Sequence, residues 1–180
     1  MLDIGEQIVG TWLKEIKGCE FVEYGVKTTG QGEIDVVGLC LKEKHAYLCE
    51  VATHVQGLWY ADSTGDTVKK LLDKFRRAAD WAESHLNKVQ CTYMLWTPAL
   101  TRPKSKSKLD SFGAVEQVKA ELKQKDRDFE VVTNEGYQEA LESLRERASK
   151  ITSNPSSPVL RLMQIEESNK RMTSRLRRAE

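Results

Sequence analysis

The sequence predicts an α/β protein with a mixed central sheet flanked by helices. Segments rich in strand-forming residues alternate along the chain with segments of helical periodicity. Two of the strand-like segments are separated by only a few residues, which predicts a hairpin. A later one, VQCTYMLWTP (89–98), is almost continuously apolar, as are strands buried on both faces of a sheet. At 180 residues, the chain is long enough to bury a hydrophobic core.

Each element has its own signal. Residues 2–17 should form a helix, because Ile4, Ile8, Trp12 and Ile16 recur every four residues and Gly18 follows. The segment around LKEK should turn the hairpin near residues 42 and 43, and residues 66–86 show the clearest helical periodicity. The expected order is helix 2–17, strands 19–25, 33–40 and 45–52, helix 66–86, strand 89–98, helix 111–125, strand 129–133 and helix 135–150.

The segment SNPSSP (153–158) should break the chain after the last of these helices. We therefore expect one domain over residues 1–152, followed by a linker and a basic, amphipathic C-terminal tail over residues 153–180. The tail is a candidate contact for a second copy of the chain or for another protein.

Composition limits the classes of function. The 28 basic and 27 acidic residues leave a formal charge of +1, so only local clusters of charge would indicate nucleic-acid binding. The four cysteines lack metal-site spacing and are expected to be free, buried thiols. We see no secretory signal pattern and no apolar run near the roughly 18 residues that span a membrane. The expected location is the cytoplasm, with no membrane partner.

Two acidic residues lie inside strand-like segments: Asp35 in GEIDVVG and Glu50 in YLCEVAT. If the hairpin turns near residues 42 and 43, positions whose numbers add to 85 face each other, which sets Asp35 opposite Glu50. Like charges in such a pair are destabilising unless one acid is protonated, both are solvated, or a divalent cation lies between them. Strand geometry alone leaves both a solvated pair and a metal site open.

An acid-bearing helix, GEID on a strand, a hairpin to CEV, and then a helix and a strand together resemble the PD-(D/E)xK nuclease superfamily over about residues 3–98. Within this superfamily, these motifs most resemble those of the small bacterial nuclease-like and Holliday-junction-resolvase-like branches. The resemblance implies a restriction-endonuclease-like core, with Asp35, Glu50 and Glu6 as metal-binding acids and the Val51 carbonyl as a further ligand. It also implies Mg²⁺-dependent hydrolysis of DNA phosphodiester bonds, with Mn²⁺ as a substitute.

One position departs from the family pattern: Ala52 stands where the family has a lysine. Three interpretations are open. The lysine has moved to another element that reaches the same site, the site binds nucleic acid without cutting it, or the alanine is an engineered substitution.

The helix at 66–86 offers replacements for that lysine. Lys74 lies at the edge of its apolar stripe, where an aliphatic stem can follow the core and deliver the ammonium to the sheet, so it is the preferred candidate. Lys70 is second, and a solvated lysine remains the alternative. His54 should share the strand face of Glu50, where it is a candidate general base, metal ligand or phosphate donor, or else a structural histidine. Gln56 is a weaker candidate for a substrate contact.

Other assignments are less determined. On the first helix, the family pattern selects Glu6, whereas Glu15 projects closer to Ile4 and Ile8. Trp59 and Tyr60 are candidates for stacking on bases or for covering the core. Basic residues that could contact a phosphate backbone are Arg76, Arg77, Arg102, Lys104, Lys106, Lys108, Lys170, Arg171, Arg175, Arg177 and Arg178.

The leading functional hypothesis is therefore a Mg²⁺-dependent endodeoxyribonuclease. Asp35, Glu50 and Glu6 would form its metal site, and Lys74 would be its displaced lysine. The alternative is a catalytically inactive nuclease fold that serves as a DNA-binding or protein-interaction module.

Overall fold

A computed structural model of the chain describes residues 3–30, 32–53, 58, 60, 63–102 and 110–177, with side chains to residue 174. The predicted α/β class and the predicted order of elements are confirmed. The elements are α1 (Ile4–Glu15), β1 (Phe21–Lys27), β2 (Glu33–Cys40), β3 (His45–Val51), α2 (Thr64–His85), β4 (Gln90–Trp96), α3 (Ser111–Gln124), β5 (Asp128–Val132), α4 (Asn134–Lys150) and α5 (Pro158–Arg177).

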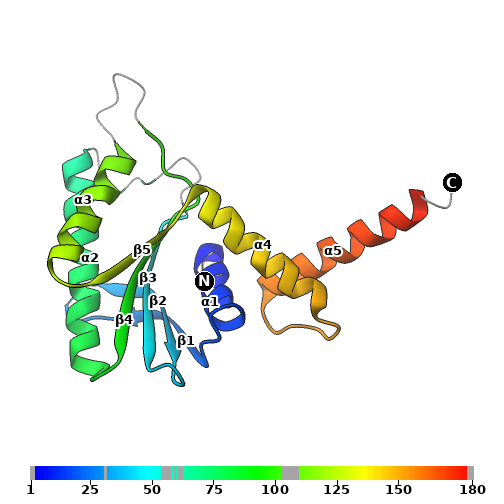
Figure 1. Ribbon diagram of the computed structural model, residues 1–180, viewed down its shortest axis with the longest axis horizontal. Coiled ribbons are helices and arrows are strands. Elements are labelled where there is room, and N and C mark those ends of the chain that lie inside the picture. Colours follow the sequence, from blue (N-terminus) through cyan, green and yellow to red (C-terminus); the bar gives the residue numbers. More distant parts are fainter. Residues whose placement is uncertain are drawn as a thin grey trace.

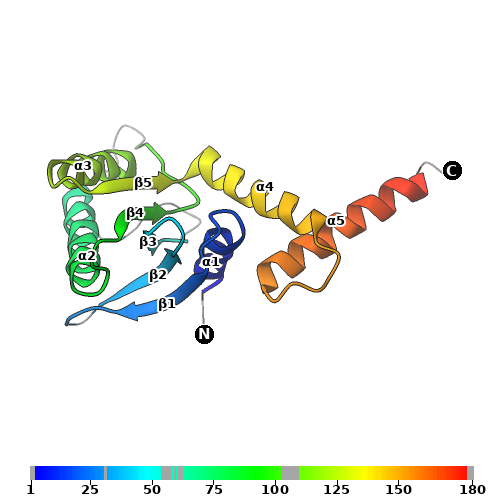
Figure 2. The same cartoon turned by 60° about the horizontal axis from the view of Figure 1, so that its bottom comes forward.

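The five strands form one mixed sheet in the order β1-β2-β3-β4-β5. The first three strands are antiparallel neighbours, and β3, β4 and β5 are parallel. Parallel neighbours need a crossover connection, and α2 and α3 supply the two crossovers here. Both lie on the same face of the sheet, while α1 and the start of α4 cover the other face (Figures 1 and 2).

Two buried clusters correspond to these two faces. One contains Leu48, Leu95 and Phe75 and joins the sheet to α2 and α3. The other contains Leu13 and Trp96 and joins the sheet to α1 and α4. Strand side chains alternate between the faces, so each strand contributes to both clusters. The four cysteines are free thiols, as predicted, and Cys91 alone among them is only half-buried.

The C-terminal tail forms a helix that packs on α4. Helix α5 begins at Pro158, a residue suited to the first turn of a helix because its missing N–H is not needed there. The Ser157 carbonyl accepts from the N–H of Arg161 at 3.0 Å, and its hydroxyl contacts that of Thr11 on α1 at 2.8 Å. The expected boundary at 152–153 falls in the connection before α5. No helix in the described ranges has the length and apolar character needed to cross a membrane.

Gly10 marks a close contact between α1 and the sheet. A Cβ atom added there would overlap the ring and hydroxyl of Tyr24, whereas one added at Gly136 on α4 would meet nothing within 4 Å. We expect Gly10→Ala to lower the free energy of unfolding by roughly 1–3 kcal/mol, because the packed neighbours must shift. Gly136→Ala should raise it by up to about 1 kcal/mol. Urea denaturation of both variants checks this difference, and equal effects would contradict it.

Candidate active site

The two predicted acids lie side by side at the ends of neighbouring strands. The β2–β3 register pairs Val36 with Cys49 and Val37 with Leu48, which confirms the predicted alignment and sets Asp35 opposite Glu50 one step further. Both side chains are buried, with 8% of Asp35 and 4% of Glu50 exposed. The main-chain N–H of Val51 donates to Asp35 Oδ2 at 2.7 Å. The two carboxylates are thus neighbours in one buried site.

Helix α2 delivers a cation to this pair. Lys74 Nζ forms an ion pair and hydrogen bond with Glu50 Oε1, and its side chain is 29% exposed. Lys70, one turn earlier, donates instead to the main-chain carbonyl of Tyr60 at 2.5 Å and is exposed. Of the two lysines considered from the helical pattern, the structure therefore brings Lys74 to the acids.

Tyr60 completes the surroundings of Glu50. Its hydroxyl donates to Glu50 Oε1, the oxygen that also contacts Lys74, and its ring centroid lies 5.2 Å from Lys74 Nζ. The sequence had presented Tyr60 only as a residue for stacking or for the core. Tyr60 follows Glu50 by ten positions and lies beyond the end of β3. Neither strand nor helix periodicity could therefore predict its hydrogen bond to Glu50.

The electrostatics of the pair follow from burial. Desolvation, and then the charge of Asp35, raise the pKa of Glu50 to about 7, even though Lys74 and Tyr60 act in the opposite direction. Desolvation also raises the pKa of Asp35, opposed by Lys74 and by the Val51 N–H. Two negative charges are therefore unfavourable at this position without more positive charge than Lys74 alone provides.

This pKa predicts a pH-dependent stability. The folded protein holds the Glu50 proton more tightly than the unfolded chain, so Glu50 lowers the free energy of unfolding as pH rises from 4.5 through about 7. We expect Glu50→Gln to be more stable than the wild type at pH 8 by on the order of 1–3 kcal/mol, and equally stable at pH 4.

Urea denaturation between these two pH values measures the difference. Glu121→Gln, at an exposed position of α3, is the matched control and should keep the wild-type pH dependence. A constant difference between Glu50→Gln and the wild type over this range would contradict the assignment.

Glu6 lies on α1, within electrostatic reach of Asp35. It is half-buried, and the apolar side chains of α1 pack on the face of the sheet that α2 does not cover. Burial raises its pKa, and the charge of Asp35 adds to this effect, so the two acids interact at a distance. In the described part of the chain, no group of three or more His, Cys, Asp or Glu side chains is arranged to hold a metal ion. Glu15, the other acid considered on α1, pairs with Arg147 at 3.0 Å.

Ala52 lies in the core. Its side chain is 3% exposed and belongs to the same apolar cluster as Leu58, Val68 and Leu71. Its N–H donates to the Trp96 carbonyl at 2.8 Å, on the β4 side. The N–H of Val51 points the other way, to Asp35 on the β2 side. Because the N–H and C=O of a strand residue point to the same side, we expect the Val51 carbonyl to lie on the side of Asp35.

The remaining predicted residues contribute less. His54, Gln56, Trp59, Lys104, Lys106, Lys108 and Arg178 lie outside the described residues, as do the side chains of Arg175 and Arg177. Several described basic residues have local partners: Arg76 pairs with Asp73 at 3.2 Å, and Arg102 lies 5.4 Å from the Phe112 ring centroid. Arg77 differs, because its buried Nε has no hydrogen-bond partner among the described residues.

The site thus consists of two buried carboxylates, a lysine on one of them, and a tyrosine hydroxyl. These groups can bind a hard cation or share a proton. No protein-family model matches the chain, and comparisons with curated proteins and with solved structures return no match.

Proposed function

We propose that this chain is a Mg²⁺-dependent nuclease that hydrolyses phosphodiester bonds in DNA and has a restriction-endonuclease-like core. The observation that carries the proposal is the buried Asp35–Glu50 pair with the Lys74 ammonium on Glu50. The order helix, three strands, helix, strand agrees with the PD-(D/E)xK resemblance of the sequence. In this proposal, Lys74 replaces the lysine that the family pattern places at position 52.

The donor set suits a hard divalent cation. Asp35 and Glu50 would hold it, with the Val51 carbonyl as the main-chain ligand that the resemblance implies. Mg²⁺ is commonly bound through one or two protein carboxylates, with water and substrate phosphate at its other positions, so a third carboxylate is not required. When bound, such an ion polarises a phosphodiester and lowers the pKa of bound water.

The protein side chains have separate roles in this proposal. The Val51 N–H orients the Asp35 carboxylate, and the Tyr60 hydroxyl orients that of Glu50. Lys74 supplies a positive charge at the edge of the site, where negative charge on a phosphate would be stabilised. Glu6 would affect the pair through its charge rather than as a ligand.

Incubation with DNA tests the proposal directly. Supercoiled, linear, branched and single-stranded DNA would each be mixed with the protein and Mg²⁺ or Mn²⁺. We expect cleavage of at least one form and its loss when EDTA is added. Absence of cleavage of every form, together with no binding of either metal by calorimetry, would refute it.

A second candidate function has one specific observation in its favour. Lys74 already supplies a counter-charge to Glu50, so the acid pair has a partner without a metal. A catalytically inactive fold that binds DNA or protein would keep such an arrangement. Salt-dependent DNA binding that survives Asp35→Ala unchanged, without cleavage, would favour this candidate.

A further inference from the structure

Helix α5 has two apolar faces on opposite sides. Val159, Leu160 and Met163 are buried together with Leu144 and Ala148 of α4. The second face contains Leu162, Ile165 and Met172, which are 58%, 52% and 61% exposed. At 100° per residue, this second face points away from the face that packs on α4. Ile165, Asn169 and Met172 also line one side of a hollow whose other side is formed by Ala148, Ser149 and Ile151 at the end of α4. The C-terminal half of α5 projects away from the sheet (Figures 1 and 2).

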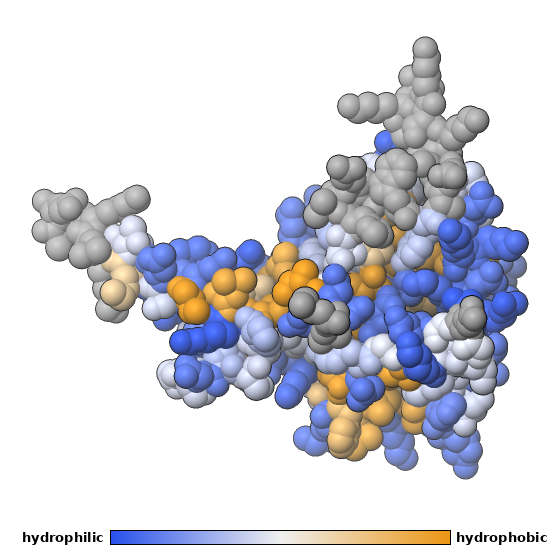
Figure 3. Space-filling view, turned by 180° about the vertical axis from the view of Figure 1, so that it is seen from behind, coloured by the Kyte–Doolittle hydropathy of each residue, from blue (hydrophilic) through white to orange (hydrophobic). Residues whose placement is uncertain are grey.

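The exposed face has the spacing of a coiled coil. Leu162, Ile165, Asn169 and Met172 follow one another at steps of three, four and three, and Leu176 continues the series in the sequence. These are the a and d positions of a heptad, with Asn169 at the central a position. We call Leu162, Ile165, Asn169 and Met172 the α5 seam. Apolar side chains are visible along the arm formed by α4 and α5 (Figure 3).

We propose that the α5 seam binds the same seam of a second copy of this chain as a parallel, in-register, two-stranded coiled coil. Asn169 identifies the occupant, because a lone asparagine at an a position hydrogen-bonds to its own counterpart across a parallel dimer. An antiparallel pair would instead set Asn169 against apolar d residues and leave its amide buried without a partner.

The charges beside the seam agree with this orientation. Arg161 and Glu166 occupy the g and e positions that flank it, and both are exposed. In a parallel dimer, Arg161 of each chain faces Glu166 of the partner subunit, which forms two complementary pairs. An antiparallel dimer would instead bring g residues beside g residues and e beside e, so Arg161 would not meet Glu166.

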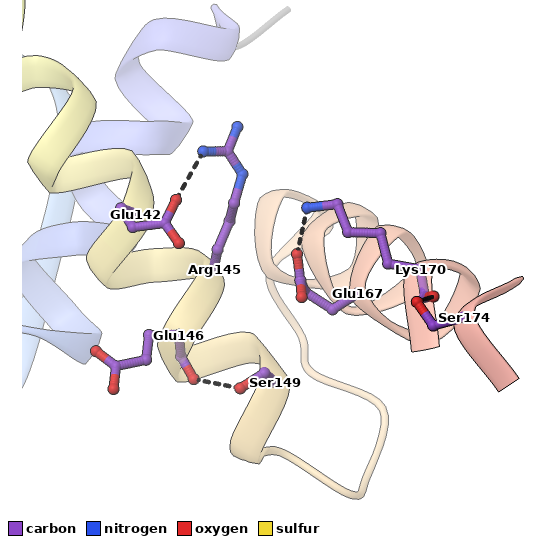
Figure 4. Close-up of polar contacts among 7 residues, drawn as sticks. All are labelled: Glu142, Arg145, Glu146, Ser149, Glu167, Lys170 and Ser174. Carbon is purple, nitrogen blue, oxygen red and sulfur yellow. Dashed lines mark hydrogen bonds and ion pairs between the residues drawn. The ribbon is translucent and has the colours of Figure 1, made fainter. Parts of the chain in front are cut away.

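Several charged side chains of this arm have partners within the chain, and Arg161 itself donates to Gln164 Oε1 at 2.6 Å on its own helix. Arg145 pairs with Glu142 on α4 at 3.3 Å, and Lys170 pairs with Glu167 on α5 at 2.6 Å (Figure 4). Arg171 donates to the Ser149 carbonyl at 3.1 Å. None of these contacts uses an apolar seam side chain, and Leu162, Ile165 and Met172 are each more than half exposed, so the seam remains available to a second helix.

Light scattering over a range of protein concentrations tests the proposal. The mass should rise toward twice the 20.5 kDa of the monomer, and Ile165→Glu should return it to 20.5 kDa. Ser174→Glu adds the same charge to the same helix away from the seam and should leave the dimer intact. A monomer mass for the wild type at the highest soluble concentration would overturn the proposal.

Charge reversal tests the parallel arrangement by itself. Arg161→Glu alone and Glu166→Arg alone should each raise the dissociation constant by about tenfold, because like charges then face each other. An equal mixture of the two variants should restore wild-type association, since opposite charges face each other only in the mixed dimer. Failure of the mixture to associate would overturn the parallel arrangement. None of these outcomes depends on nuclease activity.

Discussion

Asp35→Asn should abolish metal-dependent cleavage of DNA while leaving the protein folded. The substitution removes one of two buried carboxylates and keeps an oxygen that can accept from the Val51 N–H. In the proposed nuclease Asp35 would hold the metal ion at the reacting phosphate, so its loss should lower kcat by roughly 1,000-fold or more, which corresponds to about 4 kcal/mol of transition-state stabilisation. Steady-state cleavage assays with saturating DNA measure the effect.

Two controls separate chemistry from folding. Asp80→Asn makes the same chemical change at an exposed position of α2 and should retain full activity. Mg²⁺ should raise the melting temperature of the wild type and of Asp80→Asn but not that of Asp35→Asn, because a ligand stabilises only the state that binds it. Cleavage by Asp35→Asn at the wild-type rate would remove this residue from the site.

Lys74→Met should lower kcat by about 100- to 1,000-fold, the usual cost of removing a group that stabilises charge in a transition state. It should also move the pH dependence of the residual activity to higher pH. Lys74 lowers the pKa of Glu50, so its removal raises that pKa, and a higher pH is then needed to ionise the carboxylate.

The matched control for this variant is Lys69→Met, on the exposed face of the same helix. It should leave both kcat and the pH profile unchanged. A loss of activity in Lys74→Met with no shift in its pH profile would show that Lys74 acts independently of Glu50.

The Asp35–Glu50 pair could be predicted because its geometry is local. A short hairpin sets the register, and the period of two along each strand then determines which side chains face each other. Lys74 could be predicted for a related reason, because its place at the edge of an apolar stripe limits where its side chain can reach. The structure has both features, with the turn at Leu41–Lys44 and the ammonium on Glu50.

Other features of the site and the fold could not be predicted, because they depend on how helices and strands pack against one another. The side of the sheet that α1 covers is not encoded in its own periodicity, so the sequence could not determine how Glu6 lies relative to the acid pair. Tyr60 reaches Glu50 from beyond the end of a strand, where no repeating pattern constrains side-chain direction. The docking of α5 was also missed, because Val159 and Leu160 follow a segment with strong break signals.

The burial of Ala52 has an evolutionary consequence. A lysine introduced there in the present protein would place a second ammonium beside the Glu50 already occupied by Lys74, and it would replace a methyl group in a close-packed apolar cluster. The effect of residue 52 therefore depends on which residue stands at 74, a case of epistasis between β3 and α2. A lysine at position 52 would therefore be accommodated only together with a change at position 74.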